Sequence, residues 1–263
     1  MTPYTDGSAL VLRGDARTLP LPDASVDLVC TSPPFYALRS YTDGGQHYPG
    51  QIGSEATPAE YIANLVDCTR EWVRVLKPMG SIWVDLGDKY NSAASGQNGT
   101  GKTTLSPDRG PKMYASDRGA VAAGIRSKSL MLLPERYRIA CVDQLGLIAR
   151  AVVIWSKPNG LPESVTDRVR RSHEDWVHLV RQPRYFSAVD HIREPHTAPF
   201  KPPGSKGNPH RKDNGQPTNG EYHPLGKLPG SVWTIATEPL IVPDRLGVDH
   251  FAAFPTEWPR RII

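Results

Sequence analysis

Apolar residues along the chain fall into short runs typical of strands and longer segments with helical spacing. Runs rich in β-branched and apolar residues predict strands at residues 9–13, 26–31, 81–86, 151–155 and 176–180. Helical spacing predicts helices at residues 58–76 and 132–145, the second ended by Gly146. Because strands and helices alternate, the predicted fold class is α/β, with a doubly wound, mostly parallel sheet.

The longest predicted helix carries its own start and stop signals. Thr57 stands at the N-cap position, a proline follows it, and Glu60 completes a capping box. Pro78 and Gly80 end the helical pattern. One face of the segment collects apolar side chains, those of Tyr61, Leu65, Cys68, Trp72, Val73 and Leu76. The segment is therefore predicted to be an amphipathic helix.

The predicted strand at residues 26–31 ends in the turn Ser32-Pro33-Pro34-Phe35. The two prolines fix φ and remove two N–H donors, so the turn can neither extend a strand ladder nor begin a helix. The Ser32 hydroxyl and the carbonyls of the turn then remain as acceptors at the carboxyl end of a strand, where open α/β sheets bind ligands. Phe35 adds a flat face for stacking. This combination suits an extruded nucleobase that presents an exocyclic amine.

The turn belongs to an ordered set of segments that resembles the DNA amino-methyltransferases, which methylate N4 of cytosine or N6 of adenine. The other segments of the set are residues 14–16, 19–23, 25–29, 38–41, 74–78, 154–159 and 230–233. The resemblance covers residues 9–90 and 130–263. Its order is similar to that of the permuted subgroup, whose catalytic motif precedes the main cofactor motif. It implies a Rossmann-like, S-adenosylmethionine-dependent methyltransferase fold in which the strand predicted at residues 176–180 is antiparallel.

The resemblance also implies roles for two groups of residues. The catalytic group consists of Ser32, Pro33, Pro34 and Phe35. The group that binds S-adenosylmethionine consists of Asp15, Thr31, His250 and Phe251. The Ser32 side chain and the Pro33 carbonyl would accept the two amine hydrogens, and Phe35 would stack on a base flipped out of double-stranded DNA.

The sequence leaves alternatives for the base and for the class of substrate. In the family, serine at the first motif position is commoner in cytosine-N4 enzymes and aspartate in adenine-N6 enzymes. Ser32 therefore favours N4 of cytosine, with N6 of adenine as the alternative. An RNA-directed or small-molecule methyltransferase remains open, as does a non-catalytic, inactive DNA-binding fragment.

One family motif has no counterpart in the sequence, the Gly-rich turn of the type Asp-Pro-Phe-x-Gly-x-Gly. The chain ends instead in residues 249–263, which resemble the helix that precedes this motif in the permuted subgroup. We therefore expect a truncated or split enzyme with an incomplete cofactor site, an exposed hydrophobic sheet edge and little activity alone. A C-terminal continuation or a second polypeptide would supply the missing motif.

Composition narrows the remaining possibilities. A chain of 263 residues can bury one substantial core, so a single catalytic domain over residues 1–263 is expected. The net charge of +4 permits nucleic-acid binding without establishing it.

Cys30, Cys68 and Cys141 lack CxxC spacing, which argues for a reducing compartment and against a disulfide framework or a metal site. No membrane span or signal peptide is indicated, so a cytoplasmic protein without membrane contact is expected.

Two polar stretches, residues 91–128 and 195–230, interrupt the pattern. Both are rich in small, polar and basic residues, and neither can bury enough apolar surface to fold independently. They read equally well as solvated linkers and as binding segments. The second is the candidate target-recognition segment, in which DNA phosphates would meet Lys201, Lys206, Arg211 and Lys212.

Four further patterns suggest other chemistry, and each has a plainer interpretation. Residues 96–103 match the P-loop pattern, but no strand directly precedes them and prolines block a helix after them. His173-Glu174-Asp175 reads as a solvated strand start rather than an acid–base or metal site. Cys30 reads as a small buried hydrophobe rather than a nucleophile. Asp15 also reads as a simple turn former.

Overall fold

The computed structural model divides the chain into two compact units. The first comprises Met1–Phe186 and Val232–Ile263, and the second comprises Ser187–Ser231. The described residues are 4–5, 9–12, 14–38, 42–43, 46–47, 50–91, 124–160, 162–196, 223–239 and 253–263.

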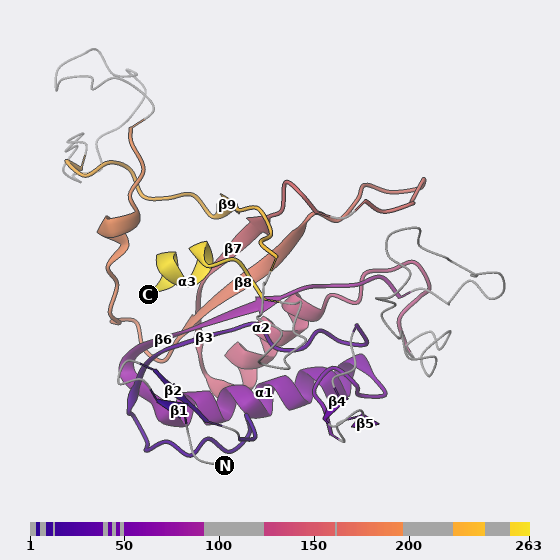
Figure 1. Ribbon diagram of the computed structural model, residues 1–263, viewed down its shortest axis with the longest axis horizontal. Coiled ribbons are helices and arrows are strands. Elements are labelled where there is room, and N and C mark those ends of the chain that lie inside the picture. The colour runs from indigo at the N-terminus through magenta and orange to yellow at the C-terminus, as the bar shows by residue number, and fades with distance from the viewer. Residues whose placement is uncertain are drawn as a thin grey trace. The chain divides into compact units, whose positions relative to one another are not determined.

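Five strands form the main sheet of the first unit (Figure 1). Their spatial order is β3 (Val26–Thr31), β6 (Leu76–Leu86), β8 (His173–Val180), β7 (Ile148–Ser156) and β9 (Val232–Thr234). β3 runs parallel to β6 and β7 parallel to β9, whereas β8 pairs antiparallel with both β6 and β7. Four strands therefore point one way and β8 opposes them. This confirms the mostly parallel α/β fold, and it confirms the antiparallel direction that the family resemblance implied for the strand at residues 176–180, which is part of β8.

Two helices cover one face of this sheet, α1 (Pro58–Val75) and α2 (Leu133–Leu145) (Figure 1). The predicted capping box of α1 is present, since Thr57 Oγ1 accepts from the Glu60 N–H at 3.2 Å and the Glu60 carboxylate accepts from the Thr57 N–H at 3.1 Å. A buried hydrogen bond of 2.7 Å joins Thr69 of α1 to the Tyr137 hydroxyl of α2. The apolar faces of both helices pack on alternate residues of β6 and β8, and the core under them includes Leu65, Tyr137, Ile82, Val84, Leu86, Val177 and Leu179.

A shorter helix, α3 (Glu257–Ile262), lies on the opposite side of the sheet (Figure 1). Its fully buried Trp258 stacks on Trp176 of β8, with ring centroids 4.6 Å apart. Trp155 of β7 and Trp233 of β9 also contact the Trp258 ring, at 5.9 and 4.9 Å between centroids. Aromatic rings bury large apolar areas, so this cluster fixes α3 on the sheet.

Two sequence predictions need correction. β6 begins at Leu76, five residues before the predicted strand, because Val26 of β3 pairs with Leu76 before the register shifts to Leu28 and Ser81. The intervening Gly80 is required there, since a Cβ would lie 2.7 Å from the Asp27 carbonyl oxygen.

The strand predicted at residues 9–13 is reduced to β2 (Leu10–Val11), which pairs with β1 (Tyr4–Thr5) outside the main sheet. Leu10 and Val11 are 57% and 61% exposed, so the burial of apolar surface does not hold them in the main sheet. A second small hairpin joins β4 (Thr42–Asp43) to β5 (Gln46–His47). Among the described residues, β3 has a hydrogen-bonded neighbour on one side only, β6.

The second unit contains the whole of the polar stretch at residues 195–230. A short helical turn, η2 (Val189–Ile192), leads into a pairing in which Glu194 and Lys227 exchange backbone hydrogen bonds of 3.0 and 2.9 Å. Their side chains form an ion pair of 3.2 Å. Lys201, Lys206, Arg211 and Lys212 lie outside the described residues, as do residues 92–123 of the first polar stretch. No helix in the described parts of the chain has the length and apolar character needed to cross a membrane.

Candidate active site

The Ser32–Phe35 turn leaves the sheet where β3 ends, two residues before the end of the neighbouring β6. Thr31 pairs with Val84, so the residues that follow these two, Ser32 and Asp85, lie side by side. The Ser32 hydroxyl donates to Asp85 Oδ2 at 3.2 Å. Ser32 is half-buried, and Asp85 is only 2% exposed. The predicted catalytic serine therefore contacts a buried carboxyl group at the carboxyl edge of the sheet.

The rest of the turn is held by neighbouring elements. The Tyr61 hydroxyl of α1 donates to the Pro34 carbonyl at 3.0 Å. Gly53, with φ +94°, lies so close that a Cβ there would be 2.9 Å from the Phe35 carbonyl oxygen. The buried Pro33, by contrast, has no hydrogen-bond partner for its carbonyl among the described residues. One carbonyl of the turn is thus fixed by the fold, and the one next to Ser32 is left as an acceptor.

The half-buried Phe35 ring lies against the backbone of Gly87, just beyond the end of β6. A Cβ at Gly87 would lie 2.5 Å from Phe35 Cε2, which is closer than carbon atoms approach. Because glycine has no Cβ, the Phe35 ring can occupy this position. Sequence reasoning identified Phe35 but missed Gly87, for which the only signal is a glycine immediately after a strand.

Asp85 lies in a cluster of charged side chains from three adjacent strands. Lys157, which follows β7, forms an ion pair of 2.5 Å with Glu174 of β8, and both side chains are 18% exposed. The Lys157 ammonium also lies 4.0 Å from the centroid of the Trp155 ring. Burial and then Glu174 raise the pKa of Asp85 well above its usual range, while Lys157 acts to lower it. Asp85 Oδ1 is buried and has no hydrogen-bond partner among the described residues.

This cluster corrects the interpretation of His173-Glu174-Asp175 as a solvated strand start. His173 is exposed, but Asp175 is only 6% exposed and Glu174 is paired with Lys157. The antiparallel β8 lies between β6 and β7, so its first residues face the carboxyl ends of both neighbours. The described residues contain no group of acidic, histidine or cysteine side chains that could hold a metal ion.

Asp88, three residues after Asp85, has a structural role. Its carboxylate accepts from the backbone N–H groups of Leu132 and Leu133 at the start of α2, both at 3.1 Å. Arg171 lies 3.6 Å from the same carboxylate. Carboxylates at helix N-termini satisfy N–H groups that have no partner within the helix. Asp88 therefore anchors α2 to the end of β6.

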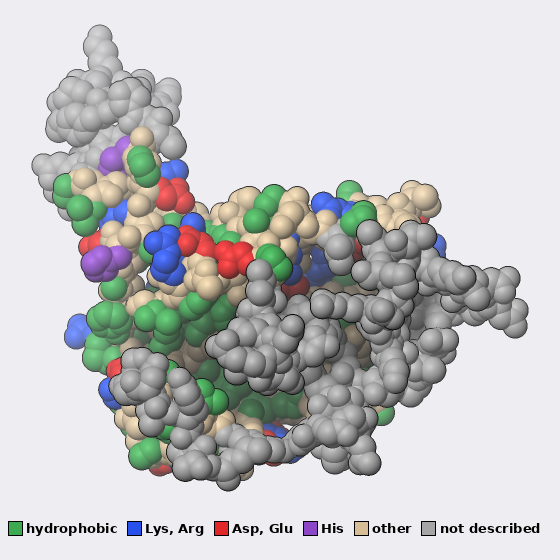
Figure 2. All heavy atoms as spheres, in the orientation of Figure 1, with side chains coloured by type: hydrophobic (Ala, Val, Ile, Leu, Met, Phe, Trp, Pro, Cys, Tyr) green, Lys and Arg blue, Asp and Glu red, His purple; other side chains and the backbone are tan. Residues whose placement is uncertain are grey.

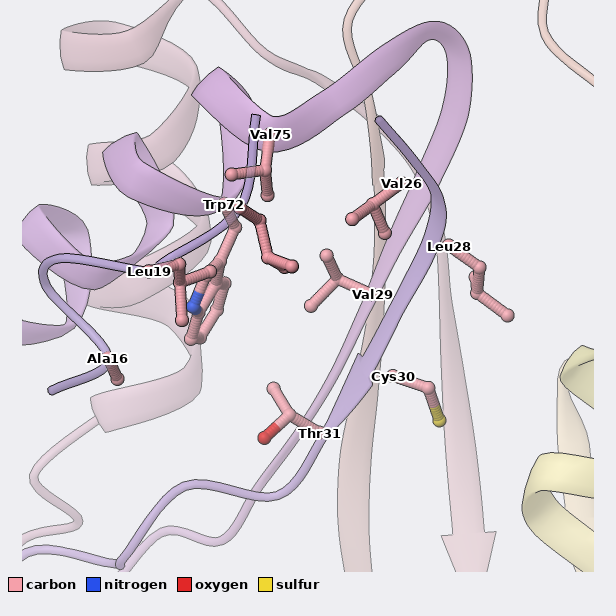
Figure 3. Close-up of a pocket in the computed structure, with 10 residues that line it drawn as sticks. Ala16, Leu19, Val26, Leu28, Val29, Cys30, Thr31, Trp72 and Val75 are labelled. Atoms are coloured by element: carbon pink, nitrogen blue, oxygen red, sulfur yellow. The ribbon is translucent and has the colours of Figure 1, made fainter. Parts of the chain in front are cut away.

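A pocket of about 340 Å³ lies along β3, beside Thr31 (Figure 3). Figure 3 shows Thr31 and Val29 pointing to the side of β3 where Leu19 and Trp72 lie, with Leu28 and Cys30 pointing to the other side. Apart from Thr31 and Cys30, the lining residues are apolar. Burial raises the pKa of the Cys30 thiol to about 11, so Cys30 is not a thiolate nucleophile, although it is half-buried rather than fully buried.

Of the other predicted cofactor residues, Asp15 does not line this pocket, although its neighbour Ala16 does. Asp15 is in a turn, where its carboxylate accepts from the Arg17 guanidinium at 2.7 to 3.2 Å. These hydrogen bonds lower the pKa of Asp15 to about 2. His250 and Phe251 lie outside the described residues, as do residues 96–103 with the P-loop pattern.

An open α/β sheet with a Ser-Pro-Pro-Phe turn at the carboxyl end of one strand is the architecture of the amino-methyltransferase class. A sequence profile of the DNA methylase family, which groups N6 and N4 methyltransferases, matches residues 26–263. The chain belongs to this family, and it is a DNA amino-methyltransferase of Type II, the modification component of restriction–modification systems.

Individual relatives agree with this assignment. The chain is 30% identical to Type II methyltransferase M.Cfr9I of Citrobacter freundii, over 99% of this chain and 73% of that protein. It is 34% identical to Type II methyltransferase M.SmaI of Serratia marcescens, over 97% and 74%. The solved PvuII DNA methyltransferase (cytosine-N4-specific) shares the fold, with a TM-score of 0.56 and 17% identity over 95% of this chain and 67% of that chain.

The methyl donor of this family is S-adenosylmethionine, which is therefore the cofactor of this chain. Such a cofactor needs an acceptor for its adenine amine and polar groups for its ribose and methionine ends. Of the residues predicted for these contacts, Asp15 has its carboxylate engaged by Arg17, and Thr31 lines the apolar pocket.

Proposed function

We propose that this protein methylates N4 of cytosine in duplex DNA, acting on a base flipped out of the helix. The observation that carries the proposal is the pair of acceptors at the end of β3. Ser32 Oγ is held by its hydrogen bond to Asp85 at 3.2 Å, and the neighbouring Pro33 carbonyl has no partner among the described residues. Two acceptors side by side match the two hydrogens of an exocyclic amine.

The chemistry that these acceptors perform is positioning. The lone pair of an exocyclic amine is delocalised into the ring, which makes the nitrogen a poor nucleophile. Hydrogen bonds to Ser32 Oγ and the Pro33 carbonyl favour a pyramidal nitrogen whose lone pair is available for the incoming methyl group. The nitrogen gains one methyl group and releases one hydrogen as a proton. Oriented acceptors in a desolvated site supply most of the rate for such a step.

Phe35 is proposed to stack on the flipped base. Unstacking a base from duplex DNA costs a few kcal/mol, and stacking on an aromatic side chain returns about 1–3 kcal/mol. The contact with Gly87 holds the ring in place before the base arrives. Pro34, whose carbonyl is fixed by Tyr61, keeps the turn rigid.

On the cofactor side, Asp15, Thr31, His250 and Phe251 remain proposed binding residues. An adenine amine could reach the Asp15 carboxylate only after its pair with Arg17 opens. We also propose that a further strand, from a C-terminal continuation or a second polypeptide, completes the site by adding to the edge of β3 that has no strand neighbour among the described residues. The one-sided pairing of β3 and the apolar pocket beside it support this proposal.

We propose that the segment at residues 195–230 contacts DNA phosphates. We also propose that residues 1–263 form a single catalytic domain. On the face shown in Figure 2, described Lys and Arg side chains are scattered among acidic ones and do not gather in one basic patch. Many described cations are also engaged in ion pairs, including Arg17, Arg74, Lys77, Lys128 and Lys157. The basic residues of that segment are therefore the best candidates for phosphate binding.

Mass spectrometry of nucleosides tests the choice of base. DNA from cells that express the active protein should contain N4-methylcytosine, and DNA from cells that express the Ser32→Ala variant should not. N6-methyladenine instead would assign the alternative base. No methylated amine in either sample, with DNA binding retained, would indicate a non-catalytic DNA-binding fragment.

A further inference from the structure

A short ribbon of two segments extends beyond the carboxyl end of β6, on the same edge of the sheet as the Ser32–Phe35 turn. Residues 88–91, which follow β6, run antiparallel to residues 128–132, and backbone hydrogen bonds of 2.6 to 2.9 Å join the two segments. The start of α2 is tied to the same place, because Asp88 accepts from its first N–H groups. The second segment of the ribbon is therefore held next to the candidate active site.

A pocket along this second segment carries positive charge. The pocket has a volume of about 470 Å³ and is lined by residues 124–130, Leu132 and Arg136. The charged side chains among these residues are Arg126, Lys128 and Arg136, and the described part of the lining contains no acidic residue. Two serines add hydroxyl groups. Arginine, lysine and serine side chains are the groups that most often bind phosphate oxygens.

Two of the three cations in the pocket are not neutralised by a carboxylate. Arg126 is exposed, and its side chain has no hydrogen bond or ion pair with any residue that the structure describes. Arg136 is also exposed, and its Nε donates to the Met131 carbonyl at 2.9 Å, which orients the guanidinium without cancelling its charge. Lys128, by contrast, pairs with Asp167 at 2.7 Å. The pocket thus keeps an excess of two positive charges, in a chain whose net charge is +4.

The ribbon brings these charges within reach of DNA bound at the active site. The Phe35 ring lies against Gly87, the residue directly before the ribbon. An extended residue rises about 3.3 Å, so residues 88–91 reach at most about 13 Å beyond Gly87. One strand of duplex DNA rises about 3.4 Å per nucleotide along the helix axis. A duplex with its target base against Phe35 would therefore bring phosphates roughly three or four nucleotides away to the pocket.

We propose that this pocket binds backbone phosphates of the substrate duplex beside the flipped base, through Arg126 and Arg136. A guanidinium can hold two phosphate oxygens at once, which fixes the orientation of the DNA as well as attracting it. These contacts add to those proposed for residues 195–230. The inference rests on the proposed function in taking duplex DNA as the substrate, and it does not depend on which base is methylated.

The salt dependence of DNA binding tests the two arginines. Each phosphate contact that is lost should lower the slope of log Kd against the logarithm of salt concentration by about 0.9, and should weaken binding about fivefold to tenfold at about 0.1 M salt. Arg126→Gln should lose one contact, and Arg126→Gln combined with Arg136→Gln should lose two. Arg126→Lys keeps the charge and should keep the wild-type slope. Because Arg126 is exposed and unpaired among the described residues, its substitution should leave the fold intact.

Fluorescence anisotropy of the 263-residue chain with a short labelled duplex measures these slopes and requires neither cofactor nor methyl transfer. Arg70→Gln is the matched control, because Arg70 is an exposed arginine that pairs with Asp67 of the same helix. It lies in the C-terminal half of α1, which leads directly into the amino end of β6, away from the ribbon. Arg70→Gln should therefore bind DNA with the wild-type slope.

A competition experiment separates duplex phosphates from free phosphate. Inorganic phosphate should displace the duplex no better than chloride does at equal ionic strength, because the duplex is held by several phosphates together. Saturable binding of inorganic phosphate to the wild type that is lost in Arg126→Gln would instead assign a site for a free phosphate, and would overturn the proposal.

Three outcomes of the salt titration would also overturn it. One is the same slope for the wild type, Arg126→Gln and the double variant. Another is an equal fall of the slope in Arg70→Gln, which would mean that any surface arginine has this effect. The third is a wild-type chain that does not bind the duplex even at low salt. Failure of the proposed function would appear separately, as the wrong methylated base or as normal transfer by Ser32→Ala.

Discussion

The position of the Phe35 ring depends on the absence of a side chain at residue 87. In Gly87→Ala the new Cβ would lie 2.5 Å from Phe35 Cε2 and 2.8 Å from Cδ2. Carbon atoms in contact are separated by about 3.5 Å, so the ring must move by roughly 1 Å. The ring is a side chain that can rotate, so overpacking should cost the fold only about 1–3 kcal/mol.

The cost to the reaction should be larger than the cost to the fold. A displacement of roughly 1 Å in a group that positions a reacting base lowers the rate by on the order of 100-fold. We therefore expect Gly87→Ala to reduce methyl transfer by about 10- to 100-fold, although residue 87 has no proposed role in the chemistry. The loss should appear in the initial rate of methyl incorporation into DNA by the active protein, at a temperature well below unfolding.

A double-mutant cycle separates this mechanism from a general disturbance. In a Phe35→Ala background there is no ring to displace, so adding Gly87→Ala should cost little further activity. An equal loss from Gly87→Ala with and without the Phe35 ring would refute the reasoning.

Three further results are expected. Ser32→Ala should lower methyl transfer by about 100-fold, since it removes one acceptor, and should cost the fold about 1–3 kcal/mol, since the buried Asp85 loses its hydrogen-bond donor; near-normal transfer would place the acceptor elsewhere. Burial, and then Arg150, lower the pKa of His178 to about 4 from 6.5, so the unfolded chain binds more protons between these values. The free energy of unfolding should therefore fall as the pH drops below 6.5, and at pH 5 the wild type should have lost about 2 kcal/mol relative to His178→Gln. A difference in the free energy of unfolding between the two proteins that does not change with pH would contradict this. Calorimetry of the 263-residue chain with S-adenosylmethionine should detect no micromolar binding, and such binding would show that the cofactor pocket is complete in this chain.

Local signals predicted the elements that depend on neighbours in the sequence. The start of α1 was correctly placed because Thr57 and Glu60 satisfy each other's backbone groups within one turn. The Ser32 turn was placed at the end of β3 because two prolines stop any ladder. The start of β6 was missed because its first residue, Leu76, adopts the strand conformation only through its pairing with Val26 of β3.

The charged cluster behind Ser32 could not be predicted from spacing. Asp85, Lys157 and Glu174 are brought together by the strand order, in which β8 lies between β6 and β7. In the sequence, Glu174 stands in a charged run that resembles an ordinary exposed strand start. Its partial burial depends on the antiparallel direction of β8, which the family resemblance implied but the residue pattern did not.

The central claim is that the turn from Ser32 to Phe35 binds the amine that receives the methyl group. A structure of the active protein on DNA that carries its target cytosine tests this directly. The account predicts a flipped cytosine whose N4 lies about 2.6–3.2 Å from both Ser32 Oγ and the Pro33 carbonyl oxygen, with its ring against Phe35. A target base that stays stacked in the duplex, or that binds away from Ser32, would contradict it.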